Sequence, residues 1–367
     1  MAGHPTGEAP RLDRVAMTEA PARLTLIASR VEQRIDEVLV AELERWRTVD
    51  PDLAAPLDAL RRLVLAGGKR LRPAFCHWAF VGAGGDPDAA TVVDAGAALE
   101  LLHTFALIHD DIMDGSTTRR GLDATHVLFQ DLHAAGQWHG EARRFGEGVG
   151  ILVGDLAFVY ADLFLRDAPG DALDVFTELR LEVNIGQYLD LLGTVRRDAS
   201  VDAARRICIY KSGRYTTERP LHLGAALAGR LNELQDPLTA FGAPLGEAFQ
   251  LRDDLLGVFG DTAVTGKPVG EDLREGKPTA LYALAAAEAD GAAAELLARR
   301  FGSPDLAEDE ITQLQEVLVA TGAKDKVEAR IGELLDQSLL ALARTPITDE
   351  ARTELEALAV YVAGRDH

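Results

Sequence analysis

The chain has 367 residues, enough to bury a large core, and 38 Lys and Arg against 59 Asp and Glu give it a formal net charge of -21. This charge repels nucleic acid and anionic membrane surfaces, so we expect no nucleic-acid partner, and any phosphate substrate must be held by local basic residues and bound cations. Helix-forming residues dominate, aromatic residues make up 6%, and the two cysteines, Cys76 and Cys208, show no zinc or disulfide spacing, which predicts an all-α protein in a reducing cytoplasm.

The N-terminal segment differs from the rest of the chain. Residues 1-20 lack a charged start followed by an apolar core, which predicts a mobile polar extension rather than a targeting signal. From Arg23 apolar residues recur at helical spacing up to Asp50-Pro51, and a second pattern runs over 57-65 before Gly67-Gly68. Residues 21-367 contain no linker, so we expect one all-helical domain. We also expect no transmembrane segment, because no uninterrupted apolar stretch is long enough.

Further helices are predicted along the rest of the chain from apolar periodicity. They cover residues 89-113, 151-166, 172-192, 201-212, 215-228, 234-259 and 281-289, with more in the acidic C-terminal third. Residues 115-150 have weaker periodicity and predict flexible catalytic loops. Residues 260-280 mix glycines, prolines and alternating charges, which predicts an ordered loop with a function.

Two aspartate-rich clusters follow apolar segments, Asp110-Asp111-Ile112-Met113-Asp114 and Asp253-Asp254. Asp110 and Asp114 are four residues apart, so on a helix both carboxylates project from one face, where like charges destabilise the helix. Magnesium would neutralise them, because it takes oxygen ligands from one or two carboxylates together with substrate phosphates. The alternative is a solvated acidic helix end, but the helix leading into the first cluster is too apolar for a surface element.

Basic residues near the clusters suit phosphate binding. The segment 67-73, GGKRLRP, places three cations beside a glycine turn with accessible backbone N–H groups. Arg119-Arg120 adds two fork-shaped donors, although a basic pair in a surface loop is the simpler alternative. Lys211, Lys267 and Lys277 complete a dispersed set. Together with the two acidic clusters, these residues favour a magnesium and diphosphate site over solvated surface charge.

With these motifs in order along the chain, the sequence resembles the trans-isoprenyl diphosphate synthase (polyprenyl synthetase) family over roughly residues 22-345. The motifs are GGKRLRP at 67-73, DDIMD at 110-114 with RRG at 119-121, GQYLD at 186-190, YKSG at 210-213 and QLRDD at 250-254, followed by the GKP and EGK lysines. The resemblance implies a single helical bundle around a central active-site cavity, usually as a homodimer. It also implies head-to-tail addition of isopentenyl diphosphate to dimethylallyl, geranyl or farnesyl diphosphate.

The resemblance further implies a role for each matching residue. The metal ligands would be Asp110, Asp114 and Asp253, holding three Mg²⁺ ions that bridge to the allylic diphosphate, with Asp111 and Asp254 in support. The residues gripping that diphosphate would be Arg119, Lys211, Lys267 and Lys277. The isopentenyl diphosphate site would be Lys69, Arg72, His103 and Arg120, although His103 would otherwise be a satisfied core histidine. At the reacting centre, Ser212 and Gln250 would face the developing allylic cation, and Lys211 would lie beside them.

Elementary chemistry supports these roles. Departure of diphosphate concentrates negative charge, which metals and fixed cations stabilise while an apolar pocket shields the allylic cation from water. The isopentenyl double bond then attacks, and the released diphosphate accepts the lost proton. One position departs from the family pattern: the second motif usually ends with a third Asp, whereas position 257 is Gly, with Asp261 four residues later. This departure leaves open how the second cluster shares the metals.

Product length depends on residues one turn before Asp110. If the diphosphate is anchored at the end of this helix, the hydrocarbon tail runs back along it and meets Phe105 and Ala106 first. One aromatic at 105, a small Ala at 106 and no insertion in the first motif resemble enzymes that stop near geranylgeranyl diphosphate (C20), with farnesyl (C15) or longer products as alternatives. Replacement of Phe105 by Ala is therefore expected to lengthen the product.

Two other functions are compatible with a helical chain of this kind. A class I terpene cyclase shares the first aspartate motif but has no use for Lys69, Arg72 and Arg120, and its second metal motif is absent from the sequence. A non-catalytic partner subunit is expected to have lost part of the ligand set, which this chain retains. An elongation assay with isopentenyl diphosphate, allylic primers and magnesium distinguishes all three.

Overall fold

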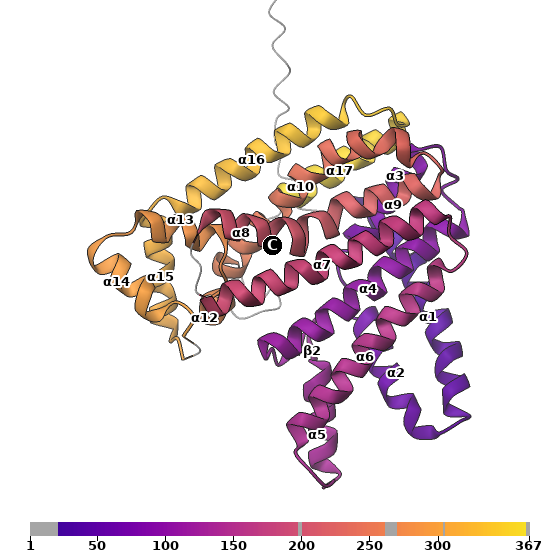
Figure 1. The fold of residues 1–367 in the computed structure, drawn as a ribbon, viewed down its shortest axis with the longest axis horizontal. Coiled ribbons are helices and arrows are strands. Elements are labelled where there is room, and N and C mark those ends of the chain that lie inside the picture. The colour runs from indigo at the N-terminus through magenta and orange to yellow at the C-terminus, as the bar shows by residue number, and fades with distance from the viewer. Residues whose placement is uncertain (1–20, 197–199, 261–269, 304, 365–367) are drawn as a thin grey trace, which may run out of the picture.

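A computed structural model describes residues 21-196, 200-260, 270-303 and 305-364 (Figure 1). The predicted N-terminal extension, Asp261 and Lys267 lie outside the described residues. The described chain is almost entirely helical, which confirms the predicted all-α class. Its elements are α1 (Ala22–Arg47), η1 (Pro51–Leu53), α2 (Ala54–Leu65), α3 (Leu71–Gly82), α4 (Ala90–Asp114), β1 (Thr118–Arg119), β2 (Leu122–Asp123), α5 (Thr125–Ala135), α6 (Ala142–Leu165), α7 (Gly170–Arg196), α8 (Val201–Ile207), η2 (Cys208–Glu218), α9 (Arg219–Leu227), α10 (Leu231–Phe259), α12 (Glu271–Glu275), α13 (Ala280–Glu288), α14 (Gly291–Arg300), α15 (Glu308–Ala320), α16 (Ala323–Leu342) and α17 (Asp349–Gly364).

Helix α4 runs through the middle of the bundle. It contacts α1, α2, α3, α6 and α9, and its apolar residues between Val92 and Ile108 are largely buried. By length and composition, α4 and α6 are each apolar enough to cross a membrane, contrary to the expectation that no stretch is long enough. In α4, 61% of the most apolar 18-residue segment is buried in the protein, which explains its composition. In α6, 44% of the corresponding segment is buried, and several apolar side chains are exposed.

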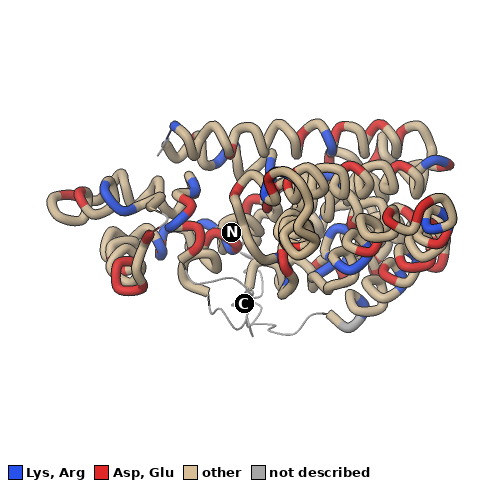
Figure 2. Tube along the Cα trace, turned by 90° about the horizontal axis from the view of Figure 1, so that it is seen from below, with Lys and Arg blue, Asp and Glu red and all other residues tan. Residues whose placement is uncertain are grey.

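Two hydrophobic clusters make up the core. One joins α1, α2, α4, α6 and α7, and includes the fully buried Phe176. The other joins α3 to α10, α16 and α17, and includes Phe75 and Phe241. Full burial of one such side chain contributes about 1.5–3 kcal/mol. In Figure 1, α16 and α17 lie beside α10, and α2 and α5 lie on the opposite side of the bundle. Figure 2 shows acidic and basic positions interspersed along the helices.

Residues 115-150, predicted to be flexible loops, are mostly regular structure, so that prediction is wrong. They form the β1–β2 hairpin, in which Thr118 pairs with Asp123, then α5 and the start of α6. The buried side of α5 includes Thr125, His126 and His133, whose polarity hides the helical pattern. Gly146 of α6 is needed for close packing, because a Cβ there would lie 2.2 Å from the carbonyl oxygen of His126. Such a glycine resembles a loop signal in the sequence.

The predicted helices at 201-212 and 215-228 form one continuous structure. Its middle part, η2, is a π-helix, a rare form that is frequently found at functional sites. Helix α10 follows and is unbroken despite Pro237 and Pro244. The described part of the predicted 260-280 loop contains α12, which begins after Gly270 (φ 73°) and ends before Gly276 (φ 69°), both in the left-handed region that favours glycine. These elements surround the site described below.

Candidate active site

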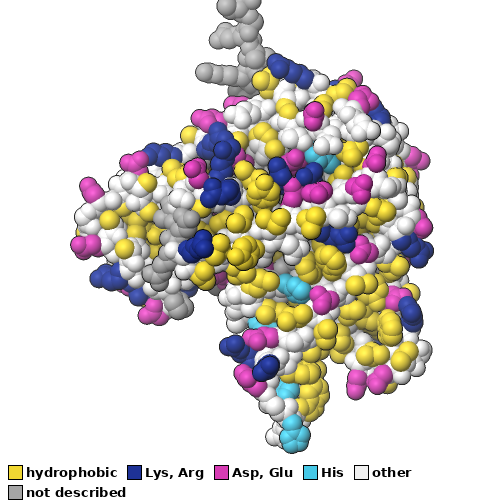
Figure 3. Space-filling model, in the orientation of Figure 1, with side chains coloured by type: hydrophobic (Ala, Val, Ile, Leu, Met, Phe, Trp, Pro, Cys, Tyr) yellow, Lys and Arg dark blue, Asp and Glu magenta, His cyan; other side chains and the backbone are white. Residues whose placement is uncertain are grey.

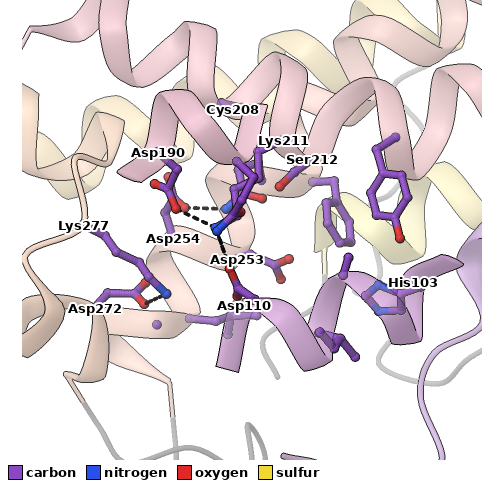
Figure 4. A pocket seen from close by; sticks show the side chains of 18 of the residues that line it. His103, Asp110, Asp190, Cys208, Lys211, Ser212, Asp253, Asp254, Asp272 and Lys277 are labelled. Carbon is purple, nitrogen blue, oxygen red and sulfur yellow. Dashed lines mark hydrogen bonds and ion pairs between the residues drawn. The ribbon is translucent and has the colours of Figure 1, made fainter. Parts of the chain in front are cut away.

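A cavity of about 680 Å³ lies among α4, α7, η2, α10 and α12, and its volume is typical of ligand pockets. Residues 68-72 and 118-121 complete its wall. Figure 4 shows Asp272 and Lys277 on one side and His103 on the other, with Asp110 and Lys211 between them. The wall thus has an acidic part with lysines, a part with arginines and His103, and an apolar part.

Lys211 of η2 links two helices in the acidic part. Its Nζ donates to Asp110 Oδ1 of α4 at 3.2 Å and to Asp190 Oδ2 of α7 at 2.5 Å (Figure 4). Gln187 Nε2 donates to the same Asp110 oxygen at 2.9 Å. Burial disfavours both charged groups, but Lys211 lowers the pKa of Asp110, and Asp110 raises the pKa of Lys211. The pair is therefore ionised at neutral pH.

Two other carboxyl groups have raised pKa values. Burial, followed by the charge of Asp110, raises the pKa of Asp114 to about 6. Burial raises the pKa of Asp254 to about 8, although Gln250 Nε2 donates to its Oδ1 at 2.7 Å. Asp114 does not line the cavity, and Lys277 Nζ lies 3.9 Å from its Oδ2. At both positions burial, together with the like charge of neighbouring carboxylates, outweighs the effect of the nearby cations.

These donors fit a magnesium ion that also binds substrate. Asp110, Asp253 and Asp254 line the cavity from two helices, α4 and α10. Among the described residues, no three His, Cys, Asp or Glu side chains converge enough to hold a metal ion by themselves. Magnesium suits such an arrangement because it is usually bound by one or two carboxylates, substrate phosphates and water.

The basic part of the wall contains Lys69, Arg72, His103 and Arg120. Arg72 lies over the ring of Tyr215, 4.2 Å from its centroid, and its Nη2 donates to Thr216 Oγ1 at 2.9 Å. Burial, then the charge of Arg72 and Arg120, lowers the pKa of His103 well below its ordinary value, so its imidazole is neutral. Burial lowers the pKa of Arg120 to about 10. An anionic ligand would relieve the repulsion among these cations.

Unsatisfied polar atoms support a ligand in this part. Arg72 Nε, His103 Nδ1 and Tyr215 OH are buried and have no hydrogen-bond partner within the described part of the chain. Buried polar atoms without partners are rare, and a ligand is one way to satisfy them. Arg70, by contrast, is committed to the protein: it is 2% exposed, pairs with Glu100, and donates from Nε to Glu32 Oε1 at 2.9 Å. Arg70 therefore anchors the 67-73 turn, although it borders the cavity together with Lys69 and Arg72.

Arg119 is held against the end of α4. Its Nε donates to Oδ1 of the buried Asp111 at 2.8 Å, and it lines the cavity from the β1–β2 hairpin. Arg120, which follows Arg119 in the hairpin, lies close to Gly68. A Cβ on Gly68 would lie 3.0 Å from Arg120 Nη2, so the glycine leaves room for this arginine. The hairpin therefore presents both arginines to the cavity.

The apolar wall includes Ala106, Leu107, Val183 and Phe249. Phe105 does not line the cavity: its ring packs 4.9 Å from that of Phe158 and 4.6 Å from that of His109, between ring centroids. The structure therefore brings Ala106, but not Phe105, to the wall. Of the other predicted site residues, Lys69, Arg72, His103, Asp110, Arg119, Arg120, Lys211, Ser212, Gln250, Asp253 and Lys277 line the cavity.

Sequence reasoning assigned no role to Gln187, Asp190 or Asp272, which also line the cavity. Gln187 and Asp190 are three residues apart and therefore share a face of α7, which was the available signal within the GQYLD motif. Asp272 lies in a segment of alternating charge, where one carboxylate cannot be told from its neighbours by spacing alone. Its place in the cavity wall follows from the packing of α12 against α10.

Comparisons with known proteins identify the family of the chain. The family model for polyprenyl synthetase matches residues 55–318. The geranylfarnesyl diphosphate synthase of Aeropyrum pernix is 33% identical over 87% of this chain and 96% of that protein. The (2E,6E)-farnesyl diphosphate synthase of Mycobacterium tuberculosis is 32% identical over 81% of this chain and 80% of that protein. The names of these relatives span more than one product length.

A solved structure gives the same result at the level of the fold. The geranylgeranyl pyrophosphate synthase of Corynebacterium glutamicum, in complex with isoprenyl diphosphate and magnesium, superposes with a TM-score of 0.84 at 40% identity, covering 91% of this chain and 98% of that one. Together with the family match and the cavity described above, this likeness is sufficient for assignment. The chain belongs to the polyprenyl synthetase family and is a trans-prenyl diphosphate synthase, a prenyltransferase of isoprenoid biosynthesis.

Proposed function

We propose that this enzyme uses Mg²⁺ to condense isopentenyl diphosphate head-to-tail with dimethylallyl, geranyl and farnesyl diphosphates, ending at geranylgeranyl diphosphate. The observation that carries the proposal is the division of one cavity into a carboxylate-rich part and a cationic part, joined by an apolar wall. The two substrates need such a division because their diphosphates behave differently. The allylic diphosphate must leave with the electron pair of its C–O bond, whereas isopentenyl diphosphate keeps its diphosphate group.

In this proposal the allylic diphosphate binds at the acidic part. Asp110, Asp114 and Asp253 would hold magnesium, three ions in all, against the diphosphate. When bound, magnesium would neutralise the negative charge that grows as the allylic C–O bond breaks. Arg119, Lys211 and Lys277 would donate to the diphosphate oxygens, and Lys267, from outside the described residues, is assigned the same role.

Isopentenyl diphosphate would bind at the cationic part through Lys69, Arg72, His103 and Arg120. The buried Arg72 Nε and His103 Nδ1, which lack partners in the described chain, support this assignment. Since His103 is neutral, one ring nitrogen can donate to a phosphate oxygen without adding to the crowded positive charge. Charge-assisted hydrogen bonds of this kind fix the double bond next to the allylic carbon.

The chain's own residues would then protect the cation. Gln250 commits its amide nitrogen to Asp254 and would offer its carbonyl oxygen to the allylic cation, together with Ser212. Leu107, Val183 and Phe249 would exclude water from it. The double bond attacks the cation, a new C–C bond forms, and the diphosphate that left accepts the proton lost from the adjacent carbon.

We further propose that the product is C20 because Ala106 leaves room for the growing chain. Ala106 lines the cavity one turn before Asp110, so the tail meets a methyl group there rather than a large side chain. Phe105, turned toward Phe158, would form a second layer behind this wall. The C20 product lies between the farnesyl and geranylfarnesyl products named for the relatives above.

We also propose a cytoplasmic homodimer built on α6 and α7. Exposed apolar side chains recur at helical spacing on both helices: Leu152 and Val159 on α6, and Leu181, Ile185 and Tyr188 on α7, the last 64% exposed. Arg180 of α7 donates to Asp162 of α6 at 2.8 Å, which joins the two helices into one surface. In Figure 3, hydrophobic side chains gather over this face. Such a surface on a soluble chain favours burial against a second copy.

Elongation by the purified protein tests the proposal. Isopentenyl diphosphate and magnesium are supplied with each allylic primer, and products are measured by mass after dephosphorylation. The expected result is accumulation of C20 from all three primers, with loss of activity in Asp110→Asn and retention in the exposed control Asp123→Asn. Cyclic hydrocarbon would indicate a terpene cyclase, and no elongation would indicate a non-catalytic subunit.

A further inference from the structure

A charged side chain, Arg180 of α7, lies beyond the apolar wall of the cavity. Gln187 lines the cavity beside Asp110, and Val183 lines it one turn farther back along α7. Arg180 lies seven residues before Gln187, so it shares nearly the same face of the helix about 10 Å farther from the acidic part. A hydrocarbon tail that grows along α7 from the acidic part therefore runs toward Arg180.

The Arg180 guanidinium lies over two aromatic rings. Its Cζ is 5.0 Å from the ring centroid of Phe158 on α6 and 4.8 Å from that of Phe176 on α7. Its Nη1 donates to Asp162 Oδ1 at 2.8 Å. The face of an aromatic ring attracts a cation, and here two rings and a carboxylate act on the same guanidinium. Arg180, whose side chain is 19% exposed, is therefore held by three side chains.

Phe158 connects Arg180 to the cavity wall. Its ring also packs 4.9 Å from that of Phe105, between centroids, and Phe105 precedes the cavity-lining Ala106 on α4. Phe105, Phe158 and Arg180 thus form a continuous row of contacts from α4 through α6 to α7. A tail that grows past Ala106 has to displace this row, and movement of Phe158 breaks its contact with Arg180.

The charge of Arg180 makes it a more effective stop than an apolar side chain of the same length. A hydrocarbon tail that packs against an apolar side chain is stabilised because both leave water. The same tail at Arg180 has to displace the rings and the Asp162 carboxylate that hold the guanidinium. A charge removed from water without a partner is costly, so a further five-carbon unit is disfavoured at this place.

We propose that Arg180 is a specificity-determining residue, which limits product length by holding Phe105 and Phe158 in place behind the cavity wall. This assignment rests on the proposed function, because it concerns the growing chain of a prenyl diphosphate synthase. It does not depend on which product length the parent chain reaches. It gives a role to a cation that lies outside both aspartate clusters and outside the GQYLD motif of the same helix.

Product mass and the kinetics of the first condensation test the assignment together. Arg180→Met keeps an unbranched stem and removes the guanidinium. With isopentenyl diphosphate, magnesium and dimethylallyl diphosphate, its final product is expected to be at least one five-carbon unit longer than that of the parent chain. The kcat and KM of the first condensation should stay within about twofold of the parent, because a short tail does not reach Arg180. A merely structural role would lower these constants and leave the product length unchanged.

Arg34→Met is the matched control. Arg34 also lies over a phenylalanine ring, 5.5 Å from the centroid of Phe164, and donates to Asp94 Oδ1 at 2.7 Å. It belongs to α1, which does not line the cavity, so its loss should leave the product length unchanged.

A conservative variant separates the charge from the flat guanidinium. Arg180→Lys retains the charge but not the planar group that lies over the two rings, so a mixture of parental and longer products is expected. Thermal melting and light scattering check the folding and assembly of each variant. If Arg180→Met does not fold, Arg180→Lys against Arg34→Met decides.

The outcomes separate the two proposals. Unchanged product length in a folded Arg180→Met enzyme, or equal lengthening in Arg180→Met and Arg34→Met, would overturn the assignment alone. Each variant is compared with the parent chain's own product, so a parent that stops at a length other than C20 corrects the proposed function and leaves this test decisive. A parent chain that elongates no primer would overturn the proposed function and this assignment with it.

Discussion

At the scale of single residues, the site is dominated by buried charge whose balance changes with pH and with ligand. Asp254 is the clearest case, because burial raises its pKa to about 8 while its ordinary value is 3.8. Burial also raises the pKa of Asp114, to about 6. Both carboxyl groups hold a proton in the folded chain that the unfolded chain has already lost.

Asp254→Asn should therefore change how stability depends on pH. Between about pH 4 and pH 8 the folded chain binds more protons at residue 254 than the unfolded chain, so this group lowers stability as pH rises. Without metal, the variant should melt at a higher temperature than the parent, and the difference should grow by several degrees between pH 5 and pH 8.5. Differential scanning calorimetry at both pH values measures this, and a variant that melts lower at pH 8.5 would contradict the raised pKa.

Arg72 is expected to act on one substrate only. Arg72→Met keeps the stem that packs on Tyr215 but removes the guanidinium, so KM for isopentenyl diphosphate should rise about tenfold or more, the usual effect of losing a hydrogen bond to a charged group. KM for farnesyl diphosphate should change much less. Arg252→Met is the control, because Arg252 pairs with Glu328 and does not line the cavity. Equal rises for both substrates would contradict the division of the cavity.

Product length should respond to the size of residue 106. Ala106→Phe places a ring in the cavity wall and is expected to stop elongation at C15 or C10, because the tail has less room. Phe105→Ala removes a ring from the layer behind the wall and is expected to lengthen the product. Mass measurement of the alcohols obtained by dephosphorylation gives the lengths. If the Ala106→Phe enzyme still accumulates C20, the size of residue 106 does not limit product length.

At the scale of elements, the π-helix η2 is positioned by glycines on its neighbours. A Cβ on Gly186 of α7 would lie 2.2 Å from the backbone nitrogen of Lys211, and one on Gly246 of α10 would lie 2.4 Å from the carbonyl oxygen of Gly213. The two helices thus approach the backbone of η2 closely on either side of Lys211 and Ser212. These contacts fix where the two side chains enter the cavity.

Gly186→Ala should therefore reduce kcat through displacement of η2. The added methyl group has to push the backbone at Lys211 away, and a shift of about 1 Å in a catalytic group can lower the rate a hundredfold. Gly148→Ala on α6 is the control, since a Cβ there meets nothing within 4 Å. Steady-state kinetics of both variants, with melting curves, measures the effect. A fully active Gly186→Ala enzyme would show that the position of η2 is not critical.

The sequence predicted the long helices because apolar periodicity is strong in them, as in α1, α4 and α10. It failed for 115-150, where buried histidines and tightly packed glycines such as Gly146 imitate a loop. Residues such as Lys69, Arg72 and Asp110 could be predicted to lie in the site because each belongs to a motif whose residue types and spacing indicate its chemistry. Asp272 could not, because only the packing of α12 against α10 brings it to the cavity wall.

At the scale of the whole molecule, the exposed apolar faces of α6 and α7 determine the expected assembly. Leu152→Arg with Val159→Arg places two charges in the proposed interface, so the variant should be monomeric. Leu26→Arg is the control, at a side chain on α1 that is 62% exposed and away from this face. Size-exclusion chromatography with light scattering measures the mass. A variant that remains dimeric, or a parent chain that is monomeric, would contradict the proposed interface.

The two parts of the cavity are expected to bind two different diphosphates. A crystal structure of the enzyme with magnesium, isopentenyl diphosphate and an unreactive thio-analogue of farnesyl diphosphate would show where each one binds. The allylic diphosphate and its metals are expected at Asp110 and Asp253, and the isopentenyl diphosphate at Lys69, Arg72 and His103. Both diphosphates on one side, or metals bound away from these carboxylates, would contradict this division of the cavity.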